Sequence, residues 1–385
     1  MAMSRRTFIK AVGGTGLALV GVGGTFAATR TPQRALLPWE ELDNAPPADV
    51  RLDAFRHAIL APNPHNRQPW LIRLAGLDQA VIFCDLDRRL PQTDPFDRQF
   101  LIGFGCFLEI ARIAAAQRGF GMEITPFPEG LPVERLDHRP IASLRFAATG
   151  AVTKDPLFAA IPNRHSNKAP FDTARPIERS VLDALTAHAS RQAEIGTSVD
   201  AAVVQRLRTV TWDAWNTEFA TQRTWQESVD LMRIGKNEID RNPDGISIGG
   251  PLLEALAMAG QLSREQLAHP GTMAYSASAD RYRPIMASSM GYAWITTPGN
   301  SRADQLAAGR AFVRMNLEAT RQSLAFHPVS QALQEFPEMA KSFAEVHATL
   351  GAHHGERVQM LARLGYGSLA AKTPRWPLAS RLIGA

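Results

Sequence analysis

The same helical pattern occurs twice in this chain, over 98–120 and over 305–326. Each copy is an amphipathic helix that ends on a small residue and a phenylalanine before a predicted strand. The spacing from Gly103 to the final phenylalanine of the first copy equals the spacing from Gly309 in the second. Such an internal repeat predicts two similar lobes related by a pseudo-two-fold axis, along which the two glycines would let the helices approach closely. A chance likeness between two core helices is the alternative.

The length of 385 residues allows two lobes of ordinary domain size. Helical stretches and short apolar strands are predicted in both halves, so the chain is expected to contain both kinds of element. We expect a proline-rich, extended lead-in over 29–50 and a first lobe over 51–150. A short linker then leads to a second lobe over 156–385.

The segment 163–171 concentrates polar donors before a predicted helix. It places Arg164, His165, Ser166 and Lys168 within five positions. Arginine supplies a planar fork of donors, lysine a mobile charge and serine a short hydroxyl, and together they can surround a phosphate with charge-assisted hydrogen bonds. The segment therefore indicates a site for a phosphomonoester. A solvated basic loop is the alternative, because Lys and Arg lie mostly at protein surfaces.

A rigid polar turn precedes the first predicted strand of the chain. Its prolines, among them Pro62 and Pro64, restrict the backbone. The amides of Asn63, Asn66 and Gln68 offer donors and acceptors of the kind that can read the edge of a heterocycle. Taken alone, such a turn is usually structural.

Taken together, the two segments resemble signatures of the nitroreductase superfamily of FMN-dependent oxidoreductases. The segment 163–171 is similar to the family's phosphate-binding run, and the turn over 61–70 is similar to its Gln-Pro-Trp signature. The order of the two signatures is inverted here. This order resembles the two-lobed branch known as Acg-type FMN-binding oxidoreductases, in which one chain stands in for a dimer. The resemblance implies an α+β, nitroreductase-like fold whose two tandem lobes form an internal pseudo-dimer.

The segment after the second helical repeat resembles the family's Cys-Pro-Ile-Glu-Gly turn. It contains Pro328, Val329, Ser330 and Gln331, with Ser330 in place of the acidic residue and Gln331 in place of the glycine. The resemblance implies that backbone N–H groups of this turn face the flavin N5, where a donor stabilises charge on the reduced ring. These replacements leave the side-chain roles open and the backbone role intact.

The C-terminal segment over 364–378 resembles the family's closing Leu-Gly-Tyr and Pro-x-Arg-x-Pro-Leu signatures. The resemblance implies that Lys372 and Arg375 are the third and fourth cations of the phosphate site. A basic tail with a packed tryptophan is the alternative.

A predicted helix over 203–233 carries Trp212, Trp215 and Trp225. Large aromatic rings stack on planar ligands, so these residues are candidates for the substrate side of a flavin. Ordinary core between helices is an equal alternative. The segment 237–250 is interrupted by Gly and Pro, which predicts a loop or lid.

The N-terminus carries the pattern Ser-Arg-Arg-x-Phe-Ile-Lys, followed by a charge-free stretch up to residue 29. This is typical of a twin-arginine export signal, which we expect over 1–28. The translocase of that route carries folded proteins, so a passenger can bind its cofactor before export. We expect a periplasmic protein, and an uncleaved signal that tethers it to the membrane is the alternative.

Charge and cysteine content exclude several other classes. The net charge of +5 includes three cations of the predicted signal, and no basic stripe with interleaved aromatics occurs, so nucleic acid is not an expected partner. Cys84 and Cys106 have apolar neighbours and read as core residues, although a disulfide between them is an alternative in an oxidising compartment. His347, His353 and His354 lack the spacing of a metal site.

The resemblance implies an enzyme that works by ping-pong electron transfer. A reduced donor such as NAD(P)H would reduce FMN and leave, and a quinone or nitroaromatic acceptor would then take the electrons. The flavin carries this chemistry, so no side chain is assigned as acid or base. A flavin-binding or flavin-sequestering protein with a closed site and little turnover is the alternative.

Stoichiometry and assembly follow from the same signatures. Each one occurs once in the chain, which predicts one FMN per chain. Because the internal repeat replaces the dimer of single-lobed relatives, we expect a monomer.

Overall fold

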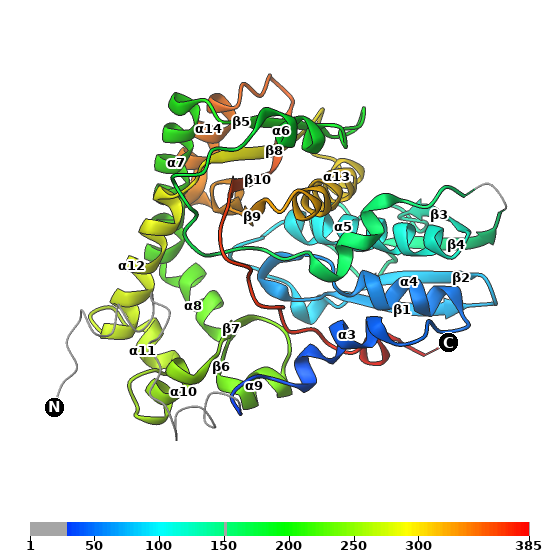
Figure 1. Ribbon diagram of the computed structural model, residues 1–385, viewed down its shortest axis with the longest axis horizontal. Helices are drawn as coiled ribbons and strands as arrows, with labels where there is room; N and C mark the ends of the chain where they lie inside the picture. The colour runs from blue at the N-terminus through cyan, green and yellow to red at the C-terminus, as the bar shows by residue number, and fades with distance from the viewer. Residues whose placement is uncertain (1–28, 150–151, 385) are drawn as a thin grey trace.

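The computed structural model describes residues 29–149 and 152–384. The predicted export signal lies outside these residues. The described chain forms two four-stranded antiparallel sheets, one from each half of the sequence, with helices packed against them (Figure 1). The predicted α+β architecture with two lobes is therefore present.

The first lobe follows the order helix, two strands, helix, two strands. Its first helix begins after Asp49, whose carboxylate accepts a hydrogen bond from the backbone N–H of Arg51 and so caps the helix. The strands pair in the order β1-β2-β4-β3. The elements are α4 (Val50–Ala58), β1 (Trp70–Ala75), β2 (Gln79–Cys84), α5 (Arg98–Gln117), β3 (Phe120–Pro126) and β4 (Ala142–Ala148).

The second lobe repeats this order, and its strands pair as β5-β8-β10-β9. In each sheet the pairing order is thus first, second, fourth, third strand, with the long helix between the second and third. The elements are α6 (Arg179–Thr186), β5 (Glu194–Ser198), β8 (Gly291–Thr297), α13 (Arg302–Arg321), β9 (Ala325–Pro328) and β10 (Arg357–Gly365). The shared topology confirms the internal repeat.

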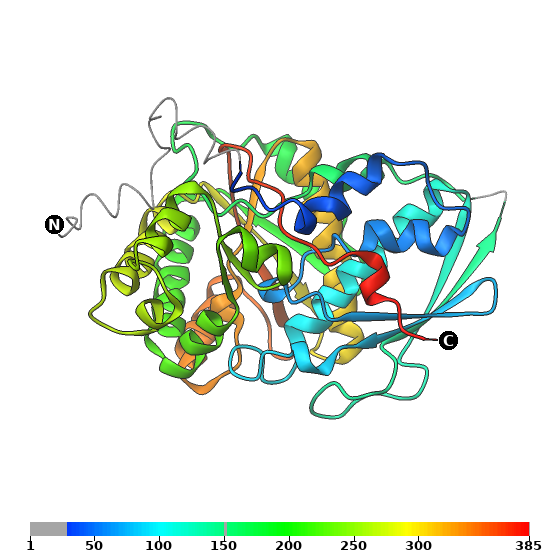
Figure 2. The ribbon, with the colours of Figure 1, turned by 90° about the horizontal axis from the view of Figure 1, so that it is seen from below.

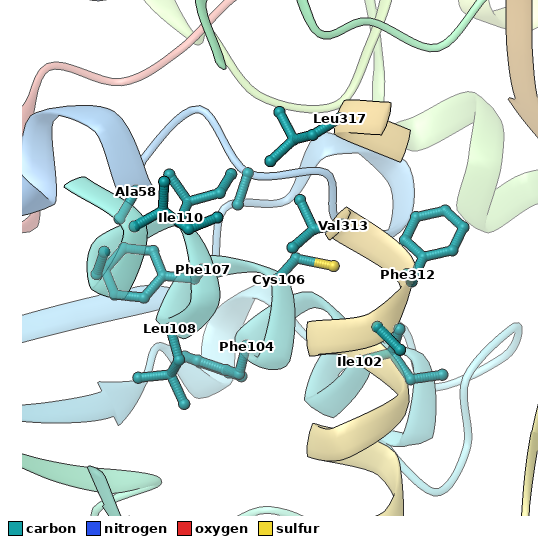
Figure 3. Packing of buried hydrophobic residues seen from close by; sticks show 14 of the residues in the cluster. Ala58, Ile102, Phe104, Cys106, Phe107, Leu108, Ile110, Phe312, Val313 and Leu317 are labelled. Atoms are coloured by element: carbon teal, nitrogen blue, oxygen red, sulfur yellow. The ribbon is translucent and has the colours of Figure 1, made fainter. Parts of the chain in front are cut away.

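Helices α5 and α13 lie side by side at the centre of the molecule (Figures 1 and 3). A Cβ added at Gly309 would lie 2.0 Å from the carbonyl oxygen of Ile102, and one added at Gly105 would lie 2.2 Å from that of Leu306. The predicted role of Gly309 in this close approach is confirmed. The predicted role of Gly103 is wrong, because it is Gly105 that faces Gly309.

Helix α5 is long and apolar enough to cross a membrane, and most of it is buried inside the protein. Figure 3 shows its apolar side chains, among them Phe107 and Cys106, packed between α4 and α13. It is therefore the central core helix of this fold.

A helical insertion separates β5 from β8 and forms the left side of Figure 1. The predicted helix over 203–233 is broken at Thr221, whose backbone is extended. At this break the Thr224 hydroxyl donates a hydrogen bond to the carbonyl oxygen of Glu218. The predicted loop over 237–250 holds a helix and one strand of a short parallel pair. The elements are α7 (Ala201–Ala220), α8 (Gln222–Asp230), β6 (Met232–Ile234), α9 (Gly235–Arg241), β7 (Ile246–Ile248), α10 (Pro251–Met258), α11 (Arg264–Ala268) and α12 (Met273–Ala287).

Helix α14 (Ala340–Thr349) lies between β9 and β10, and the short helix α3 (Leu37–Glu40) belongs to the lead-in.

The C-terminal segment leaves the second lobe after β10 and crosses to the first. The backbone N–H of Arg375 donates to the carbonyl of Ala35 (2.8 Å), and that of Ile383 donates to Ile72 in β1 (2.9 Å). The lead-in crosses the other way, since the N–H of Ala35 donates to Asp240 in α9 (2.9 Å). Figures 1 and 2 show the two segments side by side. The terminal segments thus tie the two lobes together.

Candidate functional site

A cavity of about 660 Å³ is lined by residues of both lobes. Its walls come from the turn before β1, from α5 and α13, from the segment after residue 163, from the insertion and from the C-terminal segment. This volume falls within the usual range of sites for cofactors and small molecules.

Most of the residues predicted from the sequence line this cavity. They are Pro62, Asn63, Pro64, Asn66, Arg164, Ser166, Lys168, Pro328, Ser330, Gln331, Lys372 and Arg375. The structure thus brings together four segments that lie far apart in the sequence.

Gln68, His165 and Val329 do not line the cavity. The buried amide of Gln68 donates to the carbonyl of Pro243 (2.7 Å) and accepts from the N–H of Trp376 (2.9 Å), so it ties the turn to the insertion and the C-terminal segment. The ring of His165 turns back to its own loop, where Nδ1 lies 2.8 Å from the carbonyl oxygen of Asn163. Val329 is buried in the core beside α7. These three side chains are therefore not part of the cavity wall, and a role in binding the cofactor stays a prediction for them.

Two buried guanidinium groups meet at one end of the cavity. Arg164 is 4% exposed and Arg375 is 2% exposed. Each donates to the carbonyl oxygen of Leu60, at 3.3 and 3.1 Å. Arg164 also donates to Asn316 (3.0 Å). Their remaining partners are neutral oxygens, and the Nε of each arginine is buried without a hydrogen-bond partner among the described residues.

This arrangement favours an anion. Burial lowers the pKa of Arg164 to about 10, and burial together with the charge of Arg164 lowers the pKa of Arg375 well below its usual value. Lys168 and Lys372 line the same cavity. Among the described residues, none of these four cations lies within ion-pair distance of a carboxylate. Because a buried charge without a counter-charge is unfavourable, the surroundings of Arg164 and Arg375 favour a negatively charged ligand.

The turn before β1 is held in an unusual backbone conformation. His65, Asn66 and Gln68 have φ values of 46°, 52° and 49°. Such a conformation persists only where the surroundings hold it. The side chain of Asn63 accepts from the N–H of Gln68 (2.7 Å), and that of Asn66 accepts from Arg375 (2.7 Å). Asn66 therefore links the turn to the cationic end.

Gly103 has a role in this site and none at the helix pair. A Cβ added there would lie 3.2 Å from the Cβ of Asn63, tighter than ordinary contact. The glycine therefore lets the turn lie directly on α5.

A buried ion cluster holds the turn from behind. Asp244 accepts from Arg67 (2.9 Å), Arg88 (2.8 Å) and Arg233 (2.9 Å). These arginines come from the turn, the segment after β2 and β6. One carboxylate thus fixes three segments around the cavity.

The turn after β9 lines the cavity. Ser330 and Gln331 are the first residues of a short 3-10 helix (Ser330–Leu333), a position where backbone N–H groups have no partner within the helix. The side-chain oxygen of Gln331 is buried without a hydrogen-bond partner among the described residues. This turn therefore offers unused hydrogen-bonding groups to a ligand.

Part of the cavity wall is aromatic. Trp215 and Trp225 line it, and Tyr282 stacks on Trp215 with ring centroids 4.6 Å apart. Trp212 does not line the cavity but stacks behind Trp215 at 5.7 Å. Of the three tryptophans, only Trp215 and Trp225 thus line the cavity among the described residues, and a place on the substrate side stays a prediction for these two.

Sequence reasoning missed Glu218, Tyr282 and His327, which also line the cavity. Glu218 stands one helical turn after Trp215, so both lie on the same face of α7. This spacing could have identified Glu218 as a site residue from the sequence. Arg363 donates to Nδ1 of His327 (2.8 Å), which places the proton of the neutral ring on Nε2. Burial and the nearby cations Arg363 and Lys168 lower the pKa of His327 well below its usual value, so it carries no charge at neutral pH.

Cys84 and Cys106 are buried free thiols, as expected for core residues, and they are not joined in a disulfide. Cys106 also borders the cavity, and its Sγ donates to the carbonyl of Gly309 (3.1 Å). Burial raises the pKa of both thiols, which makes them poor nucleophiles.

No family model matches the chain, but its sequence is similar to those of known proteins. It is 35% identical over 126 residues to "Putative NAD(P)H nitroreductase acg" of Mycobacterium tuberculosis, which covers 32% of the chain and 36% of that protein. The match thus spans about a third of that relative's length. "Putative NAD(P)H nitroreductase Rv3131" of the same organism is 26% identical over 347 residues, or 87% of the chain and 91% of that protein.

Among solved structures, the FMN-dependent nitroreductase NfnB from Mycobacterium smegmatis, in complex with NADPH, is 16% identical and has a TM-score of 0.35. That likeness covers 57% of this chain and 94% of NfnB. The sequence likeness to the two mycobacterial proteins supports the resemblance to the nitroreductase superfamily.

Proposed function

We propose that this protein is an FMN-dependent oxidoreductase of the nitroreductase type. It takes electrons from a reduced small-molecule donor such as NAD(P)H and passes them to a quinone or nitroaromatic acceptor by a ping-pong mechanism. The names of the relatives support the class of reaction, and the residues of the cavity support the cofactor.

The observation that carries the proposal is the pair of buried arginines, Arg164 and Arg375. A phosphate dianion between them supplies the missing counter-charge and accepts hydrogen bonds from the unpaired Nε atoms. Ser166, Lys168 and Lys372 line the same cavity and would complete a phosphomonoester site. The cavity is large enough to hold the remainder of a cofactor beyond the phosphate.

The residues present fit FMN along the cavity. The amides of Asn63 and Asn66 would read the polar edge of the ring, and the backbone N–H groups of Ser330 and Gln331 would stabilise negative charge on it. When bound, FMN accepts an electron pair from one substrate and delivers it to another. The aromatic part of the wall, around Trp215, would hold the donor and then the acceptor in turn, which is why we propose ping-pong order.

Purified protein tests the cofactor directly. We expect a yellow protein with one FMN per chain. The double variant Arg164→Ala with Lys168→Ala should lose most of its flavin, because each charge-assisted hydrogen bond contributes roughly 1.5–3 kcal/mol. Arg179→Ala, which removes a cation from the exposed face of α6, is the matched control and should retain FMN. Equal flavin content in the two variants would contradict the phosphate assignment.

Rapid anaerobic mixing with NADH or NADPH tests the reaction. Bleaching of the flavin absorbance, followed by its recovery with a quinone, is the expected result. A flavin that stays oxidised with both nicotinamides and with a chemically reduced quinone would favour the flavin-sequestering alternative.

We also propose that the chain is exported folded by the twin-arginine translocase to the periplasm. The pattern at Arg5 and Arg6 supports this proposal. Replacing both with lysine should keep the protein in the cytoplasm with its FMN bound. Unchanged export of that variant would contradict the route.

A further inference from the structure

A buried carboxyl group lies in the wall of the cavity, outside the proposed phosphate site. Glu218, in the last turn of α7, is 8% exposed and lines the cavity with Trp215 and Trp225. The side-chain amide of Gln334 donates to its Oε2 (3.0 Å). The break between α7 and α8 holds its backbone, since the Thr224 hydroxyl donates to its carbonyl (2.6 Å).

This carboxyl group is connected to the turn after β9. The backbone N–H of Gln334 donates to the carbonyl of Gln331 (2.9 Å). Glu218 is thus two hydrogen bonds away from the turn whose N–H groups we place against the reactive part of the cofactor. It also borders the aromatic part of the wall, where the acceptor would stack.

The surroundings of Glu218 raise its pKa into the neutral range. Burial raises its pKa to about 7, and the Glu227 carboxylate of α8 acts in the same direction. The hydrogen bond from Gln334, the charge of Lys168 and the hydroxyl of Ser228 act in the opposite direction and are outweighed. Both protonation states are therefore populated under ordinary conditions, as a general acid requires.

We propose that Glu218 is the catalytic proton donor to the acceptor. This inference rests on the proposed function. A quinone needs two electrons and two protons to become a hydroquinone; reduced FMN, when bound, would supply both electrons and one of the protons, which would form the first O–H bond. The second quinone oxygen then takes the proton of Glu218, so that the carboxyl O–H bond breaks and the second quinol O–H bond forms. Water in the cavity returns a proton to the carboxylate, and the product is a hydroquinone.

The variant Glu218→Gln tests the role, because glutamine keeps the size and the acceptor for Gln334 but carries no acidic proton. With chemically reduced protein we expect oxidation by a quinone to slow roughly 100-fold, as for loss of a general acid. The wild-type rate should fall as pH rises through about 7, and the variant should lack this fall. Ferricyanide, which takes electrons without a proton, is the matched acceptor and should oxidise both proteins at the same rate.

Gln334→Met shifts the same profile in a known direction. It removes a hydrogen bond that lowers the pKa of Glu218, so the fall in quinone rate should move to higher pH. A merely structural role for Glu218 predicts no such shift.

Thermal stability gives a readout that does not depend on activity. The folded protein holds the proton of Glu218 more tightly than the unfolded chain, whose glutamates titrate near 4.5. The resulting stabilisation is complete below that value and is lost as pH rises through about 7. Glu218→Gln escapes this loss, so its melting temperature should match the wild type at about pH 4 and exceed it at about pH 8.

The outcomes separate the two proposals. If quinone oxidises both proteins equally fast with the same pH profile, Glu218 is not the donor, although the proposed function stands. If the melting curves of the two proteins keep the same offset at all pH values, the carboxyl group does not titrate as argued, and the inference is overturned. A wild-type protein that binds no flavin, or that quinone does not oxidise, overturns the proposed function and this inference with it.

Discussion

At the scale of single residues, two groups of buried charges surround the cavity. One group is neutralised by a carboxylate, and the other has no counter-charge among the described residues. Asp244 neutralises Arg67, Arg88 and Arg233 behind the turn. Arg164 and Arg375, inside the cavity, have no carboxylate within ion-pair distance among the described residues. The first cluster is complete without a ligand, and the second is not. We therefore expect substitutions in the two clusters to affect different properties.

Asp244→Asn should destabilise the fold. It removes the one negative charge shared by three largely buried guanidinium groups, and leaving a buried charge without its partner typically lowers the free energy of unfolding by about 3–5 kcal/mol. Denaturant unfolding measures this change. Asp183→Asn, in an exposed pair with Arg179, is the matched control and should change stability by less than about 1 kcal/mol. A similar effect of the two variants would mean that the Asp244 cluster is not structural.

Which residues reach the site was partly predictable from the sequence. Arg164 was predicted from residue types that bind phosphate, and Arg375 from the family resemblance of the C-terminal segment. The two arginines are 211 positions apart in the sequence, and the structure brings both to the carbonyl oxygen of Leu60. The inward direction of a side chain was not predictable. Gln68 lies inside the predicted turn but points backwards, because its amide is satisfied by Pro243 and Trp376, two residues from distant segments.

At the scale of elements, the two long helices set the distance between the lobes. Both are 20 residues long, and Gly105 and Gly309 stand at the same position within each. The sequence repeat pairs Gly103 with Gly309 because the two copies are matched at their final phenylalanines, Phe120 and Phe326. Phe120 is the first residue of β3, whereas Phe326 is the second residue of β9 after a longer connection. The connection between helix and strand differs in length between the two lobes, so matching the phenylalanines offsets the two helices by two residues. Helical periodicity does not reveal the length of this connection.

The insertion was the least predictable set of elements. The strands β6 and β7 are three residues each and pair in parallel. Such short strands carry no periodic signal, and their stability comes from non-local contacts such as the hydrogen bond from the Gly245 N–H to the carbonyl of Asn66 (3.3 Å).

Gly309→Ala should separate the two helices. The added Cβ would lie 2.0 Å from a backbone carbonyl oxygen and 2.9 Å from the Cα of Gly105, neither of which can move without shifting a helix. Overpacking of this kind typically destabilises a protein by about 1–3 kcal/mol, and here it should also weaken FMN binding, because both helices line the cavity. Melting temperature and flavin retention measure the two effects. Gly121→Ala, whose Cβ would make ordinary contacts at 3.5–3.8 Å, is the control.

At the scale of the whole molecule, one chain supplies both halves of the site. The turn before β1 and helix α5 come from the first lobe, and the segment after residue 163 and helix α13 come from the second. The terminal segments cross between the lobes, so that Arg375 reaches the cavity beside the first lobe.

We therefore predict that the protein is a monomer that keeps its FMN on dilution. In an arrangement shared between two chains, dilution would separate the chains and release the cofactor together. Here the equivalent contact, between α5 and α13, is intramolecular and does not depend on concentration. Light scattering should give the mass of one chain, about 42.1 kDa less any cleaved signal. Flavin absorbance after gel filtration over a hundredfold range of about micromolar concentrations should stay proportional to protein. Loss of flavin in step with a dimer-to-monomer transition would contradict the internal pseudo-dimer.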